Sequence, residues 1–289
     1  MKPINESVII ICSIIRDAEY GLLKNKPVIQ AFCKMFNDYK IVIFENDSKD
    51  RTKLLLSNWA KEEGNHAHFI MEDYHSVSTL PPNDIGETSR YFCEKRISKM
   101  VSLRNQYMDY IEYENFNADY LMVIDLDIAR IKLEALLSSF NTSIDWDAVT
   151  AYGYSISPNF KLRYHDAYAL TEYGDENNVQ TEDRILELSQ KYKRLKPYDA
   201  WIRVFSAFGG VAIYKFEAIK GLKYQLIKNN DKRVEVKCEH FSIYKQMSEK
   251  GFNKVYINPL MKLYYESITH KIKNGIIKRM KFLTNNTRF

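Results

Sequence analysis

The sequence predicts one α/β domain with a mostly parallel central sheet flanked by helices. Short apolar runs with the character of buried strands alternate along the chain with longer stretches of helical periodicity. The run from Tyr120 to Ile124 is apolar throughout, as in a strand that is buried on both faces. No internal repeat and no low-complexity linker divides the 289 residues. We therefore expect one domain over residues 1–258, followed by a basic tail over residues 259–289.

The first half of the chain has the pattern of alternating strands and helices. Its apolar runs end in polar residues that suit turns and helix caps. Pro27 is expected to break or kink the first helix, because proline removes a backbone donor. The expected strands are 7–15, 40–45, 68–71 and 120–124, and the expected helices are 18–36, 53–63 and 91–113.

The second half continues the alternation with shorter elements. A pair of glycines, Gly209 and Gly210, precedes one strand and permits a backbone approach that a side chain would obstruct. Residues 155–166 have little regular pattern. The expected strands are 148–153, 211–214, 235–239 and 255–257, and the expected helices are 131–140, 167–170, 181–194, 216–220 and 242–250.

The composition favours a globular protein and does not indicate nucleic-acid binding. Hydrophobic residues make up 45% of the chain, which is ample for a core. The net charge of +5 is mild, whereas a nucleic-acid partner calls for a strongly basic face. The four cysteines are scattered and are expected to be buried free thiols, which favours a reducing, cytoplasmic location. The apolar run near the start is typical of a strand and not of a signal peptide.

The tail over residues 259–289 is expected to contain a basic amphipathic helix. From His270 onward it has several lysines and arginines, no acidic residue, and apolar residues at helical spacing. Such a helix either packs its apolar side on the domain or makes peripheral contact with the anionic inner face of a membrane. Both alternatives stay open.

Two carboxylates, Asp125 and Asp127, follow the central apolar run directly. The open end of a strand in an α/β sheet is where ligands bind. Neighbouring carboxylates repel each other unless a cation lies between them, and their hard oxygens suit Mn²⁺ or Mg²⁺. We interpret the pair as metal ligands. The alternative is a turn that merely caps the next helix.

Polar residues at other strand ends are candidates for binding a nucleotide. Asp47, with Glu45 as its neighbour, lies in the turn after the second strand, where small polar groups can hold a ribose or base edge. A plain capped turn is the alternative. Arg16 follows the first strand. Arg104 lies on the helix before the central strand, from which it could reach a phosphate or orient a carboxylate, and a solvent-facing position is the alternative for both arginines.

In this order along the chain, these features resemble the GT-A glycosyltransferases, which use nucleotide-sugar donors. The resemblance extends from about residue 8 to about residue 250. The stretch Glu45-Asn46-Asp47-Ser48-Lys49-Asp50-Arg51-Thr52 is similar to a turn of the fungal capsule-associated group, which is α-1,3-mannosyltransferase-like. The stretches from Tyr164 to Leu170 and from Cys238 to His240 are similar to later motifs of that group.

The resemblance implies a GT-A, Rossmann-like fold and a role for each motif. The implied roles are a nucleotide at Asp47, a metal at Asp125 and Asp127, an Arg-Asn pair at Arg104 and Asn105, an acceptor-side glycine loop at Gly209 and Gly210, and a late histidine, His240, that completes the metal or diphosphate site. A neutral imidazole is a good ligand for manganese. The alternative for His240 is a hydrogen-bonded core histidine.

Glu239 and Asp166 are the candidates for the general base. A transfer that inverts configuration needs a carboxylate within reach of the acceptor hydroxyl and with a suitable pKa. No acidic residue follows Glu239 directly, in contrast to the usual base motif of the family. If configuration is retained, the leaving phosphate can take the proton, and Asp166 would then bind a sugar hydroxyl. A structural turn is the remaining alternative for Asp166.

The implied function is metal-dependent transfer of a sugar from a nucleoside-diphosphate donor, a GDP- or UDP-sugar, to a glycan or to a lipid- or protein-linked sugar. GDP-mannose is the first expectation for the donor. A nucleotidyltransferase acting on sugar phosphates is an alternative, but the first strand lacks the glycine-rich phosphate loop that this class normally has. An inactive carbohydrate-binding module is another, against which the intact Asp125 and Asp127 argue.

Overall fold

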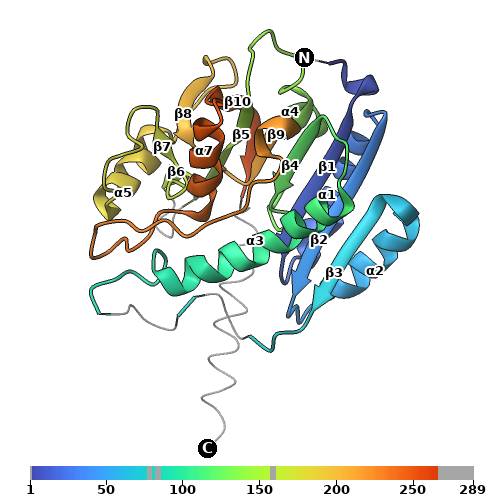
Figure 1. Ribbon diagram of the computed structural model, residues 1–289, viewed down its shortest axis with the longest axis horizontal. Coiled ribbons are helices and arrows are strands. Elements are labelled where there is room, and N and C mark those ends of the chain that lie inside the picture. The colour runs from blue at the N-terminus through green and yellow to red at the C-terminus, as the bar shows by residue number, and fades with distance from the viewer. Residues whose placement is uncertain (1, 77–79, 82–85, 157–160, 266–289) are drawn as a thin grey trace, which may run out of the picture.

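The computed structural model describes residues 2–76, 80–81, 86–156 and 161–265. These residues form a ten-stranded sheet with helices on both faces (Figure 1). The strand order is β3 (Ala67–Glu72), β2 (Asp38–Asn46), β1 (Val8–Ile15), β4 (Tyr120–Ile124), β9 (Val211–Lys215), β5 (Ala148–Ile156), β10 (Val255–Tyr264), β8 (Ile202–Ser206) and β7 (Thr171–Glu172), and β6 (Leu162–Tyr164) pairs with β5. The helices are α1 (Glu19–Cys33), α2 (Thr52–Glu63), α3 (Glu94–Glu114), α4 (Leu133–Leu137), α5 (Glu182–Lys191), α6 (Phe216–Ile219) and α7 (Glu239–Glu249), with short 3₁₀ helices η1 (Ile4–Glu6) and η2 (Gly64–His66).

The sheet runs mostly in one direction. β1 pairs in parallel with β2 and with β4, and β3 pairs in parallel with β2. β9 is antiparallel to both of its neighbours, β4 and β5, and β10 again runs parallel to β5. The carboxyl ends of β1, β2 and β4 therefore meet at one edge, where sheets of this kind bind ligands. The predicted fold class, an α/β domain with a mostly parallel central sheet between helices, is confirmed.

Alternate side chains of the strands enter two separate cores, because successive residues of a strand point to opposite faces. Ile10 and Cys12 pack in the core that includes residues of α3, α6 and α7. Ile9 and Ile11 pack in the core that includes residues of α1, α2 and α4. Figure 1 shows α3 lying across the near face of the sheet. Each polar residue at a strand end is thereby assigned to one face by its position along the strand.

Three expectations about local structure are wrong. α1 runs through Pro27 without the break that was one of the two expected outcomes. Pro27 is exposed, while the buried Leu22 and Ile29 on either side hold the helix on the sheet. Residues 235–239 form no strand beyond the isolated bridge Lys228↔Val236, because this segment folds back on residues 227–229. Residues 167–170 form a turn instead of a helix.

The last strand is longer than the expected 255–257. β10 continues to Tyr264, with a register shift in its pairing to β5 between Asn258 and Lys262. The expected basic helix after His270 lies outside the described residues. Among the described residues, no helix combines the length and the apolar character needed to cross a bilayer.

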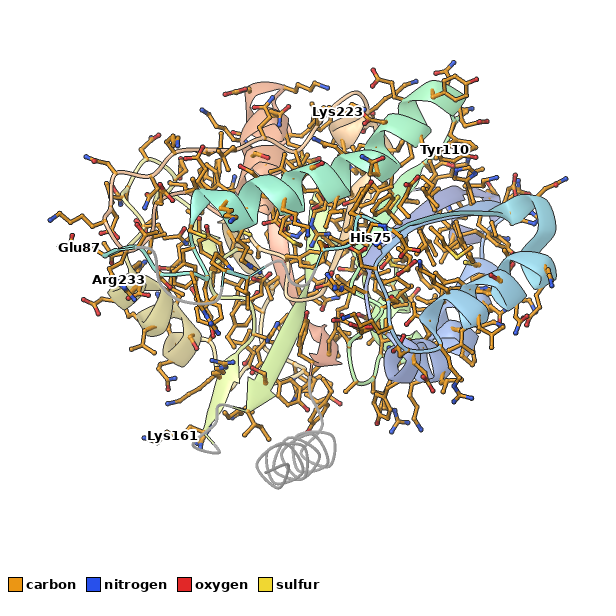
Figure 2. All side chains as sticks on the ribbon, turned by 90° about the horizontal axis from the view of Figure 1, so that it is seen from below. His75, Glu87, Tyr110, Lys161, Lys223 and Arg233 are labelled. Atoms are coloured by element: carbon orange, nitrogen blue, oxygen red, sulfur yellow. The ribbon has the colours of Figure 1, made fainter. Side chains whose placement is uncertain are left out.

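The connection between β3 and α3 is tied to a distant loop. The guanidinium Nη1 of Arg233 donates a hydrogen bond to the Glu87 carbonyl at 2.8 Å, and the two residues lie together at one end of α3 in Figure 2. The backbone N–H of Ser89 donates to the Arg233 carbonyl at 3.0 Å. Earlier in the same connection, Ser76 contacts the ends of β1 and β2, as described below.

α1 supports the loop that follows β4. An ideal Cβ on Gly21 would lie 2.2 Å from the Leu126 carbonyl oxygen, so only glycine fits there. One turn further along, the buried Asn25 donates to the Ile128 carbonyl at 2.7 Å and accepts from the Ile131 N–H at 3.1 Å. Helix α1 thus contacts and fixes the backbone from Leu126 to Ile131, which includes Asp127 and directly follows Asp125.

Replacing Gly21 is expected to displace this loop. A methyl group in Gly21→Ala meets rigid backbone, so we expect the free energy of unfolding to fall by about 1–3 kcal/mol, the usual effect of overpacking. Chemical denaturation would measure it. Lys24→Ala, at an exposed position of the same helix, is the matched control and should stay within about 0.5 kcal/mol of the unmodified chain. Equal stability of the two variants would contradict the close packing.

Candidate active site

A cavity of about 310 Å³ opens at the carboxyl edge of the sheet, between the strand ends and α3. It collects residues from both halves of the chain. Its lining residues are Ile14, Ile15, Arg16, Asn46, Arg96, Met100, Leu103, Arg104, Asp125, Asp127, His165, Asp166, Tyr168, Phe208, Cys238, Glu239, His240 and Tyr265. Four carboxylates and three guanidinium groups therefore face one small space, a balance of charges that suits a ligand with both anionic and polar groups.

Strand alternation places Asp125 and Asn46 in this cavity. Leu121 and Val123 point into the core of the α3 face, and Asp125 continues the same alternation just beyond the end of β4. On β2, Val42 points to that face, and Asn46 follows at an even spacing. Glu45 has the opposite parity, and its side chain is buried away from the cavity.

Arg104 of α3 is buried at the centre of the carboxylates. Its Nε donates to Glu239 at 3.0 Å, and its Nη2 lies 3.6 Å from Asp125 Oδ1. Its guanidinium carbon is 5.1 Å from the centroid of the Phe208 ring and 5.8 Å from that of Tyr224, within the range of cation–π contacts. Its Nη1 is buried without a hydrogen-bond partner among the described residues. Arg104 thus holds α3 and the start of α7 against the end of β4.

Three carboxyl groups of the cavity, the buried Glu239 and the half-buried Asp125 and Asp166, differ in their affinity for a proton. The pKa of Asp166 is raised to about 8, mainly by burial and also by the charges of Glu239 and Asp125. Arg104 lowers it by a smaller amount. Burial also raises the pKa of Asp125, although Arg104 opposes this effect. Burial raises the pKa of Glu239, but Arg104, together with other positively charged neighbours such as Arg96, outweighs this effect and holds the pKa at about 2. Of these three groups, Glu239 therefore stays ionised, whereas Asp125 and Asp166 change their protonation state near neutral pH.

Asp127 differs from its partner Asp125 in being exposed while it still lines the cavity. Within the described residues, no three His, Cys, Asp or Glu side chains are grouped so that they could hold a metal ion. The predicted set of Asp125, Asp127 and His240 is therefore not assembled in advance. The two aspartates do form a pair of hard oxygen donors, of the kind that holds Mg²⁺ or Mn²⁺ together with substrate phosphates.

His240 lies in an aromatic setting as the second residue of α7, and not at a strand end as expected. Its ring stacks on Phe208, with 3.9 Å between centroids. Burial lowers the pKa of His240 well below its usual value, so the ring is neutral. Neither ring nitrogen has a hydrogen-bond partner among the described residues, and Nε2 lies 3.8 Å from Glu239 Oε1.

Glu45 and Asp47 organise their turn, and neither lines the cavity. Glu45 accepts from the backbone N–H of Ser48 at 2.8 Å and lies 3.7 Å from Lys53 Nζ. Asp47 accepts from the Ser76 hydroxyl at 2.5 Å, and this bond holds its pKa below the usual value. Arg16, which does line the cavity, donates through Nη2 to the Ser76 carbonyl at 2.6 Å. Ser76 therefore links the turn after β2 to the arginine that lines the cavity.

Asn105 and the two glycines support the cavity wall from outside the lining. Asn105 donates to the Tyr224 carbonyl at 3.0 Å and accepts from the Tyr224 N–H at 2.9 Å, which fixes the ring beside Arg104. Gly209 has a positive φ of 63°, and a Cβ there would lie 2.3 Å from the Ala151 carbonyl oxygen. The Gly210 carbonyl accepts from the Asp125 N–H at 2.9 Å. These three residues position the aromatic wall and the backbone of Asp125.

Tyr265 is a site residue that the sequence patterns did not single out. Its hydroxyl donates to Asp125 Oδ2 at 3.3 Å, and its ring stacks on His165. Burial and the charges of Asp127, Asp125 and Asp166 raise the pKa of Tyr265 well above its usual value, so the phenol keeps its proton. Asn46 is a second such residue, which strict strand alternation would have identified. Strand alternation does not identify Tyr265 in the same way, because the strand before it has a register shift in its pairing to β5.

The family model described as cryptococcal mannosyltransferase 1 matches residues 9–245 of the chain. This match confirms the resemblance to fungal capsule-associated mannosyltransferases that the sequence motifs indicated. None of the curated proteins compared with the chain matches it.

Solved structures with a distant likeness include three transferases or synthases. A mannosyltransferase from Pyrobaculum calidifontis, in complex with GDP-Man and Mn²⁺, is 10% identical with a TM-score of 0.42, over 87% of this chain and 56% of that one. TarS from S. aureus, in complex with UDP-GlcNAc, is 11% identical with a TM-score of 0.43, over 90% and 58%. Glucosyl-3-phosphoglycerate synthase from Mycobacterium tuberculosis is 10% identical with a TM-score of 0.42, over 90% and 72%. The chain spans a little over half the length of the first two.

The raised pKa of Asp166 predicts a pH-dependent stability. Because its carboxyl has a pKa of about 8 in the folded chain and an ordinary value of 3.8, the folded state binds more protons between these limits. The free energy of unfolding therefore falls as the pH rises from about 4 to 8, by at most about 1.4 kcal/mol per pH unit from this group. Asp166→Asn should remove this slope, and asparagine tolerates the positive φ of 62° at this position. Urea denaturation from pH 5 to pH 8 in EDTA measures it.

The exposed Glu249, at the end of α7, provides the control for that experiment. Glu249→Gln should leave the pH dependence of the unmodified chain unchanged. The same slope in Asp166→Asn and Glu249→Gln would show that Asp166 does not carry the effect.

Proposed function

The chain belongs to the cryptococcal mannosyltransferase 1 family, and we propose that its cavity transfers a sugar, mannose in the first instance, from a nucleoside diphosphate to a hydroxyl acceptor. The observation that carries the proposal is the group of four carboxylates that line the cavity at the carboxyl edge of the sheet, two of which lie within 3.6 Å of the Arg104 guanidinium. Transfer of this kind must neutralise a leaving diphosphate and accept a proton from the acceptor. The cavity contains groups suited to both tasks.

Asp125 and Asp127 would hold a divalent cation, Mn²⁺ or Mg²⁺. The chemistry of the donors fits such an ion, because burial and the charges of Asp127 and Glu239 disfavour the ionised form of Asp125, and a nearby cation relieves this cost. When bound, the cation supplies Lewis-acid stabilisation of the diphosphate. Two protein carboxylates are enough for an ion that also takes oxygens from phosphates and water.

Two arginines that line the cavity favour an anionic donor. Arg16 is held at the end of β1 by Ser76, and Arg96 reaches the cavity from α3. The Nε of Arg96 is buried without a hydrogen-bond partner among the described residues. Asn46 also lines the cavity, and its Nδ2 donates to Asp47 at 2.9 Å, which leaves its amide oxygen for a ribose or base edge. We assign the nucleotide to this end of the cavity, with Glu45 and Asp47 shaping the turn beneath it.

Asp166 is better suited than Glu239 to accept the proton of the acceptor. A carboxylate with a pKa near 2 is a weak base, and Glu239 is also engaged by Arg104. Asp166 has a pKa of about 8, close to the value at which a general base is most effective at neutral pH. We therefore assign Asp166 as the base and Glu239 as the anchor of Arg104.

Binding of the donor can be tested by thermal shift with GDP, GDP-mannose, UDP and UDP-sugars, with and without Mn²⁺. At a ligand concentration of about 100 times Kd, the nucleotide with metal should raise the Tm by about 5 °C or more. Asp127→Asn should abolish the metal-dependent part, because it removes one ligand at an exposed position with little effect on folding. Asp183→Asn, exposed on α5 and outside the cavity, should bind as the unmodified chain does. No shift with any nucleotide would contradict the proposal.

The roles of the two acids predict different defects. Asp166→Asn should lower kcat by about 10²–10⁴-fold while the protein remains folded, as expected on loss of a general base. Glu239→Gln should mainly lower the free energy of unfolding, by about 3 kcal/mol, since it leaves buried Arg104 without its nearest partner. Rates of sugar transfer or donor hydrolysis, together with denaturation curves, separate the two. A stable, inactive Glu239→Gln beside an active Asp166→Asn would reverse the assignment.

A further inference from the structure

We propose that Tyr265 is a positioning residue for the metal-binding carboxylate of Asp125. This role rests on the proposed function, because it concerns how the Asp125–Asp127 pair is held for a cation. Tyr265 lies beyond residues 9–245, the part of the chain that matches the family model. It follows the last residue of β10 and lines the cavity.

The two oxygens of Asp125 are engaged from different directions. Oδ2 accepts a hydrogen bond from the Tyr265 hydroxyl at 3.3 Å. Oδ1 lies 3.6 Å from Nη2 of Arg104, which is too long for a direct hydrogen bond but close enough for electrostatic attraction. Tyr265 therefore donates a hydrogen bond to the Asp125 side chain, and it orients the carboxylate while leaving lone pairs of both oxygens for a cation.

Both the ring and the backbone of Tyr265 are held in place. Its ring stacks on His165, with 3.4 Å between centroids and 16° between planes. Its backbone N–H donates to the Tyr154 carbonyl at 3.1 Å, and its carbonyl accepts from the Ala129 N–H at 3.2 Å. Ala129 lies two residues after Asp127, so the same residue fixes the backbone of the aspartate loop and the side chain of Asp125.

His165 connects this arrangement to the base. It is adjacent to Asp166 in the chain, so the ring that packs on Tyr265 is carried by the backbone that carries the base. Tyr265 thus touches Asp125 through its hydroxyl and the segment bearing Asp166 through its ring. A hydrogen-bond partner behind a metal ligand orients that ligand, and its loss commonly weakens metal binding by about 10–100-fold.

Tyr265→Phe tests the role, because it removes the hydroxyl and retains the ring that stacks on His165. Tyr264→Phe is the matched control: Tyr264 is the preceding residue, is 45% exposed and packs its ring on Tyr154. The full chain is titrated with Mn²⁺ in the presence of GDP, and electron paramagnetic resonance measures the Mn²⁺ that remains free. The Kd for Mn²⁺ follows from this titration without any activity assay. We expect the Kd for Mn²⁺ to rise about 10–100-fold in Tyr265→Phe and to stay within about twofold in Tyr264→Phe.

The unfolding temperature without metal separates positioning from general stability. It should be nearly the same in Tyr265→Phe and in the unmodified chain, because the apolar contacts are kept. A Kd within twofold of the unmodified chain in Tyr265→Phe, or an equal loss in both variants, would overturn the role of Tyr265 while the metal site stands. An unmodified chain that binds no Mn²⁺ with any nucleotide would overturn the metal site, and the role of Tyr265 with it.

Discussion

The buried guanidinium of Arg104 is the interaction on which the arrangement of the cavity depends. Several carboxylates cannot share a small, poorly solvated space unless positive charge offsets their repulsion. Arg104 supplies it from α3, with Glu239 at 3.0 Å and Asp125 at 3.6 Å. The rings of Phe208 and Tyr224 pack against it and fix its orientation. Because each partner comes from a different element, this one side chain sets the distance between α3, the end of β4 and the start of α7.

The reactive groups lie on loops, yet those loops are supported by the rigid parts of the fold. Gly21 and Asn25 of α1 contact the backbone after Asp125, and the Gly210 carbonyl accepts from the Asp125 N–H. Such support lets the sheet hold Asp125 at its edge with little freedom of movement. It also explains why small residues occur at these points, because a larger side chain at Gly21 would collide with the backbone of the loop it supports.

The amino-acid sequence was sufficient for β1 to β5, β9 and β10, because apolar runs and turn residues are local signals, but it did not predict the short strands β6, β7 and β8. It was also sufficient for Asp125, Asp127 and Arg104 as residues of one site, since the ends of neighbouring parallel strands meet at one edge. Strand alternation separates Asn46, which lines the cavity, from Glu45, which does not, and this signal is present in the sequence. The sequence did not predict that Glu239 and His240 begin a helix, because the apolar Val234 and Val236 suggest a strand, whereas this segment folds back on residues 227–229. Tyr265 depends on packing between distant segments and leaves no local pattern.

The cavity brings together Arg16 and Tyr265, which are almost the whole chain apart. β10 reaches the site by inserting between β5 and β8, near one edge of the sheet. During synthesis on the ribosome, β1 and β2, whose ends position Arg16 and Asn46 at the proposed nucleotide site, emerge first. Tyr265, whose hydroxyl contacts Asp125, emerges after them. Contacts of such large sequence separation form late and slowly. A chain that lacks the end of β10 and Tyr265 would have the two aspartates without the hydroxyl that contacts Asp125.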